Sequence, residues 1–146
     1  KDEDDKWYHP SNIIISEGVT HIGSKAFYKW DSIESVVLPR TLKSIGDYAF
    51  FECSSLTSIV IPEGVTSIGY ESFCSCVNMR SITLPSTLES IGDYAFDECS
   101  KLNTVYNSSN LIIGNTSSNG CVGNYATNIY NKGEWEYVNG VPTPLK

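Results

Sequence analysis

The chain repeats itself at a spacing of 23 residues, and this period constrains its fold more than any other feature. Residues 13–35, 36–58, 59–81 and 82–104 align without a gap. Six columns of the alignment hold only apolar residues, and one of them consists of Phe27, Phe50, Phe73 and Phe96. A unit this short cannot bury its apolar side alone, so the repeats must stack and share one continuous core.

Each repeat contains the signals of one strand, one bend and one short helical segment. Leu56 to Ile61 alternates apolar with small polar residues, which is typical of a half-buried strand. Pro62 ends that strand because proline has no amide to donate. Gly46 permits a tight bend, and Asp47 then occupies the position of a helix N-cap. We therefore predict an α/β repeat solenoid, a right-handed coil with parallel strands on the concave face and short helical turns opposite.

The pattern of the unit resembles that of a known family. It reads Leu-x-x-Ile-x-Ile-Pro-x-x-Val-x-x-Ile-Gly-x-x-Ala-Phe-x-x-Cys, which is similar to the Treponema pallidum-type leucine-rich repeat of BspA-like surface proteins. The resemblance covers residues 13–105. It implies a secreted or surface-anchored, mostly bacterial protein that adheres to host matrix proteins or other cells and has no catalytic activity. The first repeat departs from the pattern at Ser16 and at Trp30, as expected of an edge unit whose core needs a cover.

The repeats divide the chain into three parts. Residues 1–12 form an acidic tail and the start of a cap, residues 13–105 hold the four repeats, and residues 106–146 form a C-terminal cap. Within that cap, Val122 to Tyr130 predicts a short helix, and Asn139-Gly140 predicts a hairpin. The proline-containing end favours either an edge strand or the start of a linker. Because the sequence begins at Lys1 with no leader, we interpret it as a processed or excised part of a longer protein.

Three of the five cysteines, Cys53, Cys76 and Cys99, share one column of the repeat. This periodicity predicts inward-facing thiols that pack as small apolar groups. The spacing leaves open whether any two form a disulfide, since the geometry of a bridge is demanding. Cys74 takes an outward position and is expected to be exposed, whereas Cys121 is expected to pack in the cap. One residue separates Cys74 from Cys76, too few for a zinc pair, so we expect no metal and no cofactor.

The strand residues between the inward columns predict a binding surface. They form two uncharged columns on the concave side, one small and hydroxylated and the other mainly β-branched. This strand strip comprises Asn12, Ile14, Ser35, Val37, Ser58, Val60, Ser81, Thr83, Thr104 and Tyr106. A flat, neutral strip suits contact with a protein or a glycan, and Tyr106 is its best single anchor. The alternative is that these residues are merely good strand formers on a solvated face.

Composition and motifs narrow the class of function. The formal net charge is −7 and the pI about 4.7, which argues against a nucleic acid or an anionic membrane as partner. No apolar run is long enough to span a bilayer, and the common nucleotide, phosphate and zinc-protease motifs are missing from the sequence. We expect a non-catalytic binding module, extracellular or at the cell surface, monomeric with at most weak self-association. A structural spacer or a self-associating scaffold domain is the alternative.

Overall fold

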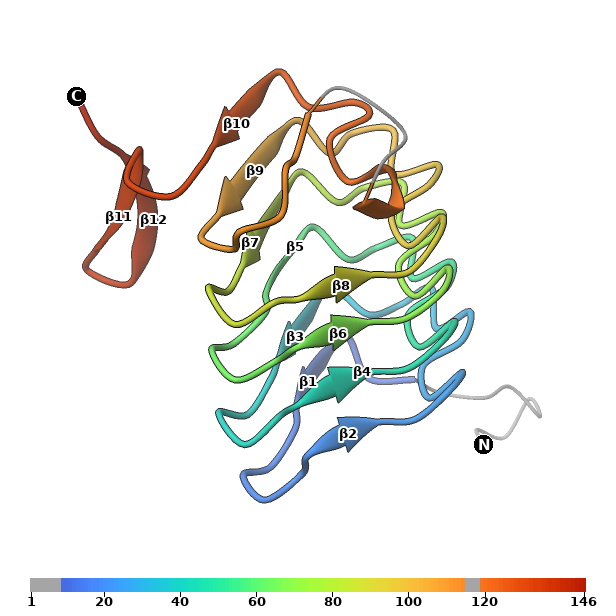
Figure 1. Ribbon diagram of the computed structural model, residues 1–146. Coiled ribbons are helices and arrows are strands. Elements are labelled where there is room, and N and C mark those ends of the chain that lie inside the picture. Colours follow the sequence, from blue (N-terminus) through green and yellow to red (C-terminus); the bar gives the residue numbers. More distant parts are fainter. Residues whose placement is uncertain (1–8, 115–118) are drawn as a thin grey trace, which may run out of the picture.

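The chain winds into a stack of coils in which two columns of parallel strands lie side by side (Figure 1). This computed structural model describes residues 9–114 and 119–146. The first column consists of β1 (Asn12–Ile14), β3 (Ser35–Val37), β5 (Ser58–Val60), β7 (Ser81–Leu84), β9 (Thr104–Asn107) and β10 (Asn128–Tyr130). The second consists of β2 (His21–Ile22), β4 (Ser44–Ile45), β6 (Ser67–Ile68) and β8 (Ser90–Ile91). The acidic start of the chain lies outside the described residues.

The strand register confirms a parallel solenoid built on the 23-residue period. Ile59 on β5 pairs with Ile82 on β7, its equivalent one repeat later. On the second column Ile45 pairs with Ile68 in the same way. Equivalent side chains therefore lie above one another, and the apolar columns read from the sequence become continuous rows through the core.

The phenylalanine column forms the centre of that core, as predicted. The ring centroids of Phe27 and Phe50, Phe50 and Phe73, and Phe73 and Phe96 are 5.1, 5.0 and 5.1 Å apart, with nearly parallel planes. Phe50, Phe73 and Phe96 are fully buried. At the first coil the edge of Trp30 packs on Phe27 at 5.2 Å, so this ring covers the end of the core as expected.

The prediction of short helical turns opposite the strands is wrong. Among the described residues the one helical segment is the 3₁₀ turn η1 (Asn119–Cys121), outside the four repeats. The segment that follows Gly46 instead bonds to the next coil, because Tyr48 N donates to Tyr70 O at 2.9 Å and Phe50 N to Ser72 O at 2.7 Å. An α-helix would use these amides internally. Asp47 likewise caps no helix, since its Oδ1 accepts from Tyr70 N at 2.8 Å.

The shared cysteine column faces inward as predicted, and its thiols also join coils. Cys53, Cys76 and Cys99 are fully buried, and none of them forms a disulfide. Each Sγ donates to the carbonyl of a phenylalanine 26 residues earlier, at 3.1 to 3.3 Å. Burial raises the pKa of all three thiols, to about 12 for Cys53. These residues thus act as packing groups with a hydrogen-bond donor.

The C-terminal segment adds one more strand to the solenoid rather than a helix. Within the predicted helix Val122 to Tyr130, the chain makes turns and then forms β10, which pairs with β9 so that Ile129 lies beside Val105. A strand forms here because Ile129 and Tyr130 continue the columns of Val105 and Tyr106. A hairpin of β11 (Trp135–Val138) and β12 (Val141–Pro144) follows, with positive φ at both Asn139 and Gly140.

Candidate binding surface

The strand strip lies on the outer face of the first strand column, as the alternation of the strands requires. Parallel pairing aligns its two columns. Asn12 lies beside Ser35, Ser58 beside Ser81, and Ser81 beside Thr104. In the second column, Ile14 lies beside Val37, Val60 beside Thr83, and Thr83 beside Tyr106.

Exposure divides the strand strip into two halves. In the half formed by β1, β3 and β5, all six side chains are exposed, including Ile14 at 79%, Val37 at 55% and Val60 at 49%. In the half formed by β7 and β9, Thr83 is only 5% exposed, and the other three side chains are half-buried. Tyr106 is therefore not the open anchor that we expected.

The hairpin β11–β12 covers this second half. Trp135 lies 5.3 Å from Tyr106 between ring centroids, and Tyr106 stacks on Tyr130 at 5.4 Å. The next aromatic residue, Tyr137, lies 5.1 Å from Trp135 between ring centroids, and its hydroxyl is near the side chain of Thr83. Burial is the main cause that raises the pKa of Tyr137, and the nearby charge of Glu63 adds to it, whereas the Thr83 side chain opposes them.

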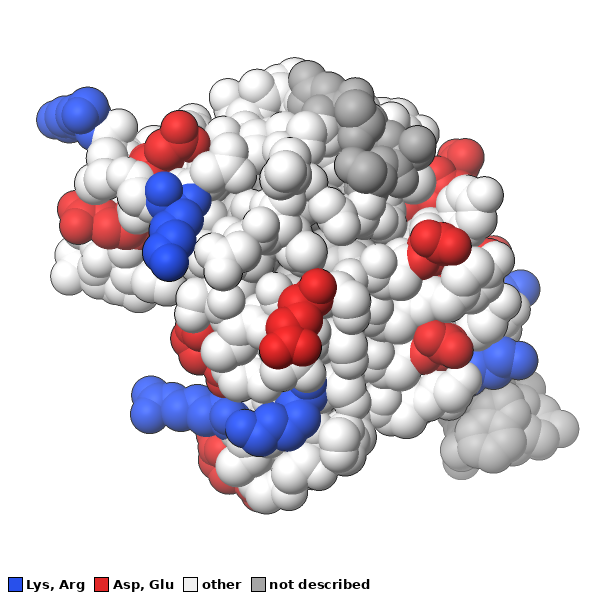
Figure 2. Space-filling view, in the orientation of Figure 1, with Lys and Arg blue, Asp and Glu red and all other residues white. Residues whose placement is uncertain are grey.

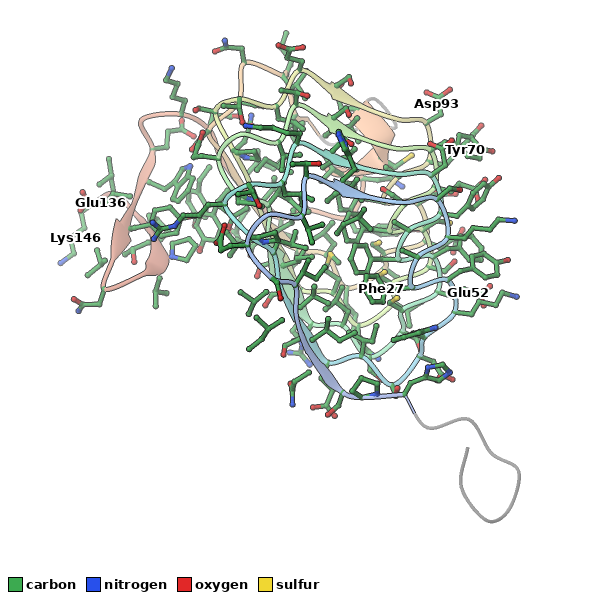
Figure 3. The ribbon with its side chains drawn as sticks, turned by 90° about the horizontal axis from the view of Figure 1, so that it is seen from below. Phe27, Glu52, Tyr70, Asp93, Glu136 and Lys146 are labelled. Atoms are coloured by element: carbon green, nitrogen blue, oxygen red, sulfur yellow. The ribbon has the colours of Figure 1, made fainter. Side chains whose placement is uncertain are left out.

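The sequence did not show this cover, because the hairpin meets the strand strip by tertiary packing alone. The only sequence signal for this contact was the aromatic residues of the hairpin, which need a surface to pack against. Figure 3 shows Glu136 of β11 and the C-terminal Lys146 on the side of the molecule away from Glu52, Tyr70 and Asp93. The open half of the strand strip and the hairpin thus share one side of the solenoid, and the turns occupy the other.

A groove interrupts the strand strip between β3 and β5. These two strands do not pair, so the first column consists of a two-stranded sheet β1–β3 and a four-stranded sheet β5–β7–β9–β10. Ile15 N donates to Val37 O at 3.0 Å and Ile61 N to Thr83 O at 3.1 Å, but among the described residues Leu38 N makes no such bond to Val60 O. The groove has a volume of about 350 Å³ and is lined by β3, Leu38, β5 and Pro62.

Two types of repeat alternate along the chain, since residues 17–20 and 63–66 read Glu-Gly-Val-Thr, and the groove lies at the seam between the second and third repeats. Glu17 belongs to the Glu-Gly-Val-Thr variant of the repeat, and its Oε1 accepts from Arg40 N at 3.2 Å in the next coil. Thr41 Oγ1 of that coil accepts from Gly18 N at 2.9 Å and donates to Val19 O at 2.8 Å. The same contacts join the third repeat to the fourth, through Glu63 with Ser86 and through Gly64 and Val65 with Thr87. Between the second and third repeats the described residues form no such clamp.

Charge is absent from the strand strip but present around it. Glu17, Arg40 and Glu63 lie at the loop edge, and Glu34 and Arg80 line a hollow at the other edge. Figure 2 shows further acidic side chains over the turn side of the coils, at the right of the view. Among the described residues, the charged side chains therefore lie beside the strand strip and not on it.

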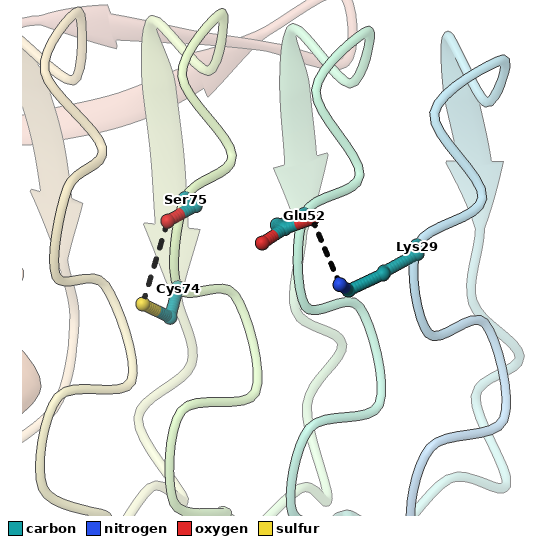
Figure 4. A network of polar contacts seen from close by, with 4 residues as sticks. All are labelled: Lys29, Glu52, Cys74 and Ser75. Carbon is teal, nitrogen blue, oxygen red and sulfur yellow. Dashed lines mark hydrogen bonds and ion pairs between the residues drawn. The ribbon is translucent and has the colours of Figure 1, made fainter.

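The turn side carries a row of aromatic rings that cover the coils. Tyr28 and Phe51 stack at 5.1 Å with an angle of 13° between their planes, and both are half-buried. Lys29 Nζ lies 3.6 Å from Glu52 Oε2 in a half-exposed ion pair (Figure 4). Beside it, Cys74 is only 7% exposed, so the prediction of an exposed thiol is wrong. The neighbouring coils cover this side chain, its Sγ lies 3.7 Å from Ser75 Oγ, and burial raises its pKa.

Within residues 9–114 and 119–146, no three His, Cys, Asp or Glu side chains are grouped so that they can hold a metal ion. Nor does the described part of the chain contain a helix long and apolar enough to cross a bilayer. What the arrangement does provide is a rigid, partly covered strand surface.

Both the repeat and the fold match known proteins. A family model described as a BspA type leucine-rich repeat region matches residues 8–125 in six copies, and the chain belongs to this family. The family is a repeat family that is generally non-catalytic. The search of curated proteins found no match.

Solved structures of bacterial leucine-rich repeat proteins are similar to this one. A protein from Bacteroides ovatus is 30% identical with a TM-score of 0.70, over 81% of this chain and 29% of that protein. The chain thus spans less than a third of that relative. The Treponema pallidum leucine-rich repeat protein is 23% identical with a TM-score of 0.61, over 82% of this chain and 68% of that protein, and this likeness concerns the fold alone. A leucine-rich cell surface protein from Faecalibacterium prausnitzii is 18% identical over 84% of this chain and 60% of that protein, and its TM-score of 0.35 is too low to support a comparison.

Proposed function

We propose that this chain is a non-catalytic binding module of a secreted or cell-surface protein, which adheres to proteins of a host or a neighbouring cell through the strand strip. Its membership of the BspA-type repeat family supports a location at the cell surface. The observation that carries the proposal is the open half of the strand strip, where six uncharged side chains on β1, β3 and β5 are exposed.

Physical arguments favour a protein partner over an ion or a nucleic acid. Exposed β-branched side chains gain about 25 cal/mol for each Å² of apolar surface that a partner removes from water. Ser35 and Ser58 beside them supply hydroxyls that both donate and accept hydrogen bonds. An anion gains nothing from a strip without positive charge. The stacked core holds the strip rigid, which limits the entropy lost on binding.

A binding assay against a panel of purified extracellular-matrix proteins tests the proposal. Ser58→Arg places a long, charged side chain in the open half, and we expect it to weaken binding at least tenfold. Ser90→Arg is the matched control, because Ser90 is also exposed but lies on β8 of the second strand column. Circular dichroism verifies that both variants fold. Equal affinity of the two variants and the parent chain for every bound matrix protein would place the contact elsewhere.

Self-association is a second candidate function, which the exposure of Ile14 at 79% beside Val37 and Val60 favours. An exposed apolar row of this kind is a common feature of interfaces. Sedimentation velocity at increasing concentration separates the two functions. A monomer throughout the range removes self-association as an explanation.

A further inference from the structure

We propose that the groove between β3 and β5 is an anchor pocket, in which a partner protein seats one aromatic side chain carried by an extended, uncharged segment. This inference rests on the proposed function and specifies the partner for the same surface. It goes beyond that function because it names one place on the strand strip and one kind of side chain.

The groove has the properties of an anchor site. Its walls are mainly apolar, with Val37 and Leu38 on one side and Val60 and Pro62 on the other, and Ser35 and Ser58 also line it. It opens where two sheet edges face each other without pairing, so main-chain groups of β3 and β5 are available beside the apolar walls. Interfaces concentrate their binding energy where a buried aromatic residue fills such a pocket and polar contacts surround it.

The covered half of the strand strip indicates what the open half binds. There the occupant is the hairpin of the chain itself, an extended segment whose aromatic residues meet the strip through Tyr106 and Thr83. Thr83 pairs directly with Val60, so the groove begins one strand beyond the covered area. A partner strand placed on the open half therefore continues an interface that already exists within the molecule.

Charge selects the same kind of segment. No strip residue is charged, and its edges carry both signs, with Glu17, Arg40 and Glu63 at one edge and Glu34 and Arg80 at the other. A charged residue placed over the groove loses hydration without gaining an ion partner in the strip. An uncharged segment with one tryptophan, tyrosine or phenylalanine avoids this cost.

Selection from a phage-displayed library of random 12-residue peptides tests the pocket on the intact chain. We expect the selected peptides to share a central aromatic residue between uncharged neighbours. Val60→Arg should weaken their binding at least tenfold. Val77→Arg is the matched control, because Val77 is 38% exposed and lines a hollow on the turn side. It should leave the affinity within twofold of that of the parent chain.

A third variant separates the pocket from the rest of the strip. Ile14→Arg alters the same column outside the groove, and we expect a smaller loss than for Val60→Arg. Equal losses for these two variants, or peptides without an aromatic residue, overturn the anchor pocket while leaving binding by the strip in place. Peptides insensitive to Val60→Arg, Ile14→Arg and Ser58→Arg overturn both proposals. A library that yields no binder also overturns the pocket, and the matrix-protein assay then decides the proposed function alone.

Discussion

Gly23, Gly46, Gly69 and Gly92 share one column of the repeat. The close approach of neighbouring coils along this column gives the sharpest test of the stacked architecture. A Cβ added at Gly69 would lie 2.6 Å from both N and Oδ1 of Asp47, and 2.7 Å from the carbonyl carbon of Gly46. Non-bonded heavy atoms normally stay about 3.5–4.0 Å apart. Gly69→Ala therefore forces the second and third coils apart by about 1 Å, and main-chain atoms cannot yield as a flexible side chain does.

The expected cost has two parts. Overpacking of this kind costs about 1–3 kcal/mol. The separation also stretches the bond from Gly69 N to Ile45 O at 2.9 Å and that from Tyr70 N to Asp47 Oδ1 at 2.8 Å, each worth about 1 kcal/mol. We expect a loss of about 2–4 kcal/mol in the free energy of unfolding, and a fall in melting temperature of about 2–4 °C for each kcal/mol.

Gly23 in the first coil is the matched control, because an added Cβ there meets no atom within 4 Å. Gly23→Ala should raise stability by up to about 1 kcal/mol, since alanine has fewer unfolded conformations to lose. Urea unfolding followed by circular dichroism measures both variants, with the m-value as the check on two-state behaviour. A Gly69→Ala variant within 0.5 kcal/mol of the parent, or equal losses at the two sites, would refute the reasoning.

Three further predictions follow from buried groups. Within the described ranges, Ser72 Oγ is buried and has no hydrogen-bond partner. Ser72→Ala should therefore raise the melting temperature through a gain of about 1–3 kcal/mol, and a destabilised variant would contradict this. Burial raises the pKa of the Cys53 thiol to about 12. The buried thiol therefore contributes its full stabilisation below the unfolded pKa of about 8.5. This contribution to the free energy of unfolding declines by about 1.4 kcal/mol per pH unit as the pH rises through 9–12. Urea titrations at pH 7 and pH 10 should show that the free energy of unfolding declines less for Cys53→Ala than for the parent chain. Trp135→Ala removes the contact with Tyr106 and should accelerate hydrogen exchange of the hairpin amides but not of those in β7, whereas unchanged exchange would show that other contacts hold the hairpin.

The sequence predicted the core well because the core is periodic. Every residue of the phenylalanine column faces inward, as do Cys53, Cys76 and Cys99, since a fixed period leaves stacked coils no other way to bury them. The turns were not predictable from local signals. Tyr48 and Glu52 adopt positive φ of 57° and 55°, and they do so because their amides bond to the next coil.

The candidate site was predictable in its positions but not in its accessibility. Alternation along each strand placed all ten residues of the strand strip on one face, and nothing local marked Thr83 as covered. The hairpin that covers it lies more than 50 residues away in sequence, and aromatic packing decides where it rests. The groove lies where β3 and β5 do not pair, and no local signal in either strand predicted that gap.

The clamps between alternate repeats also bear on how the array responds to mechanical load. Glu17 and Thr41 hold the first two coils together, and Glu63 and Thr87 hold the next two. The middle seam lacks these clamps and relies on the second strand column, on core stacking and on turn-side bonds such as that from Phe50 N to Ser72 O. Pulled from its ends, such a chain should separate at that seam before either pair of coils opens. A tethered module built in this way would lengthen in stages, each with its own rupture force.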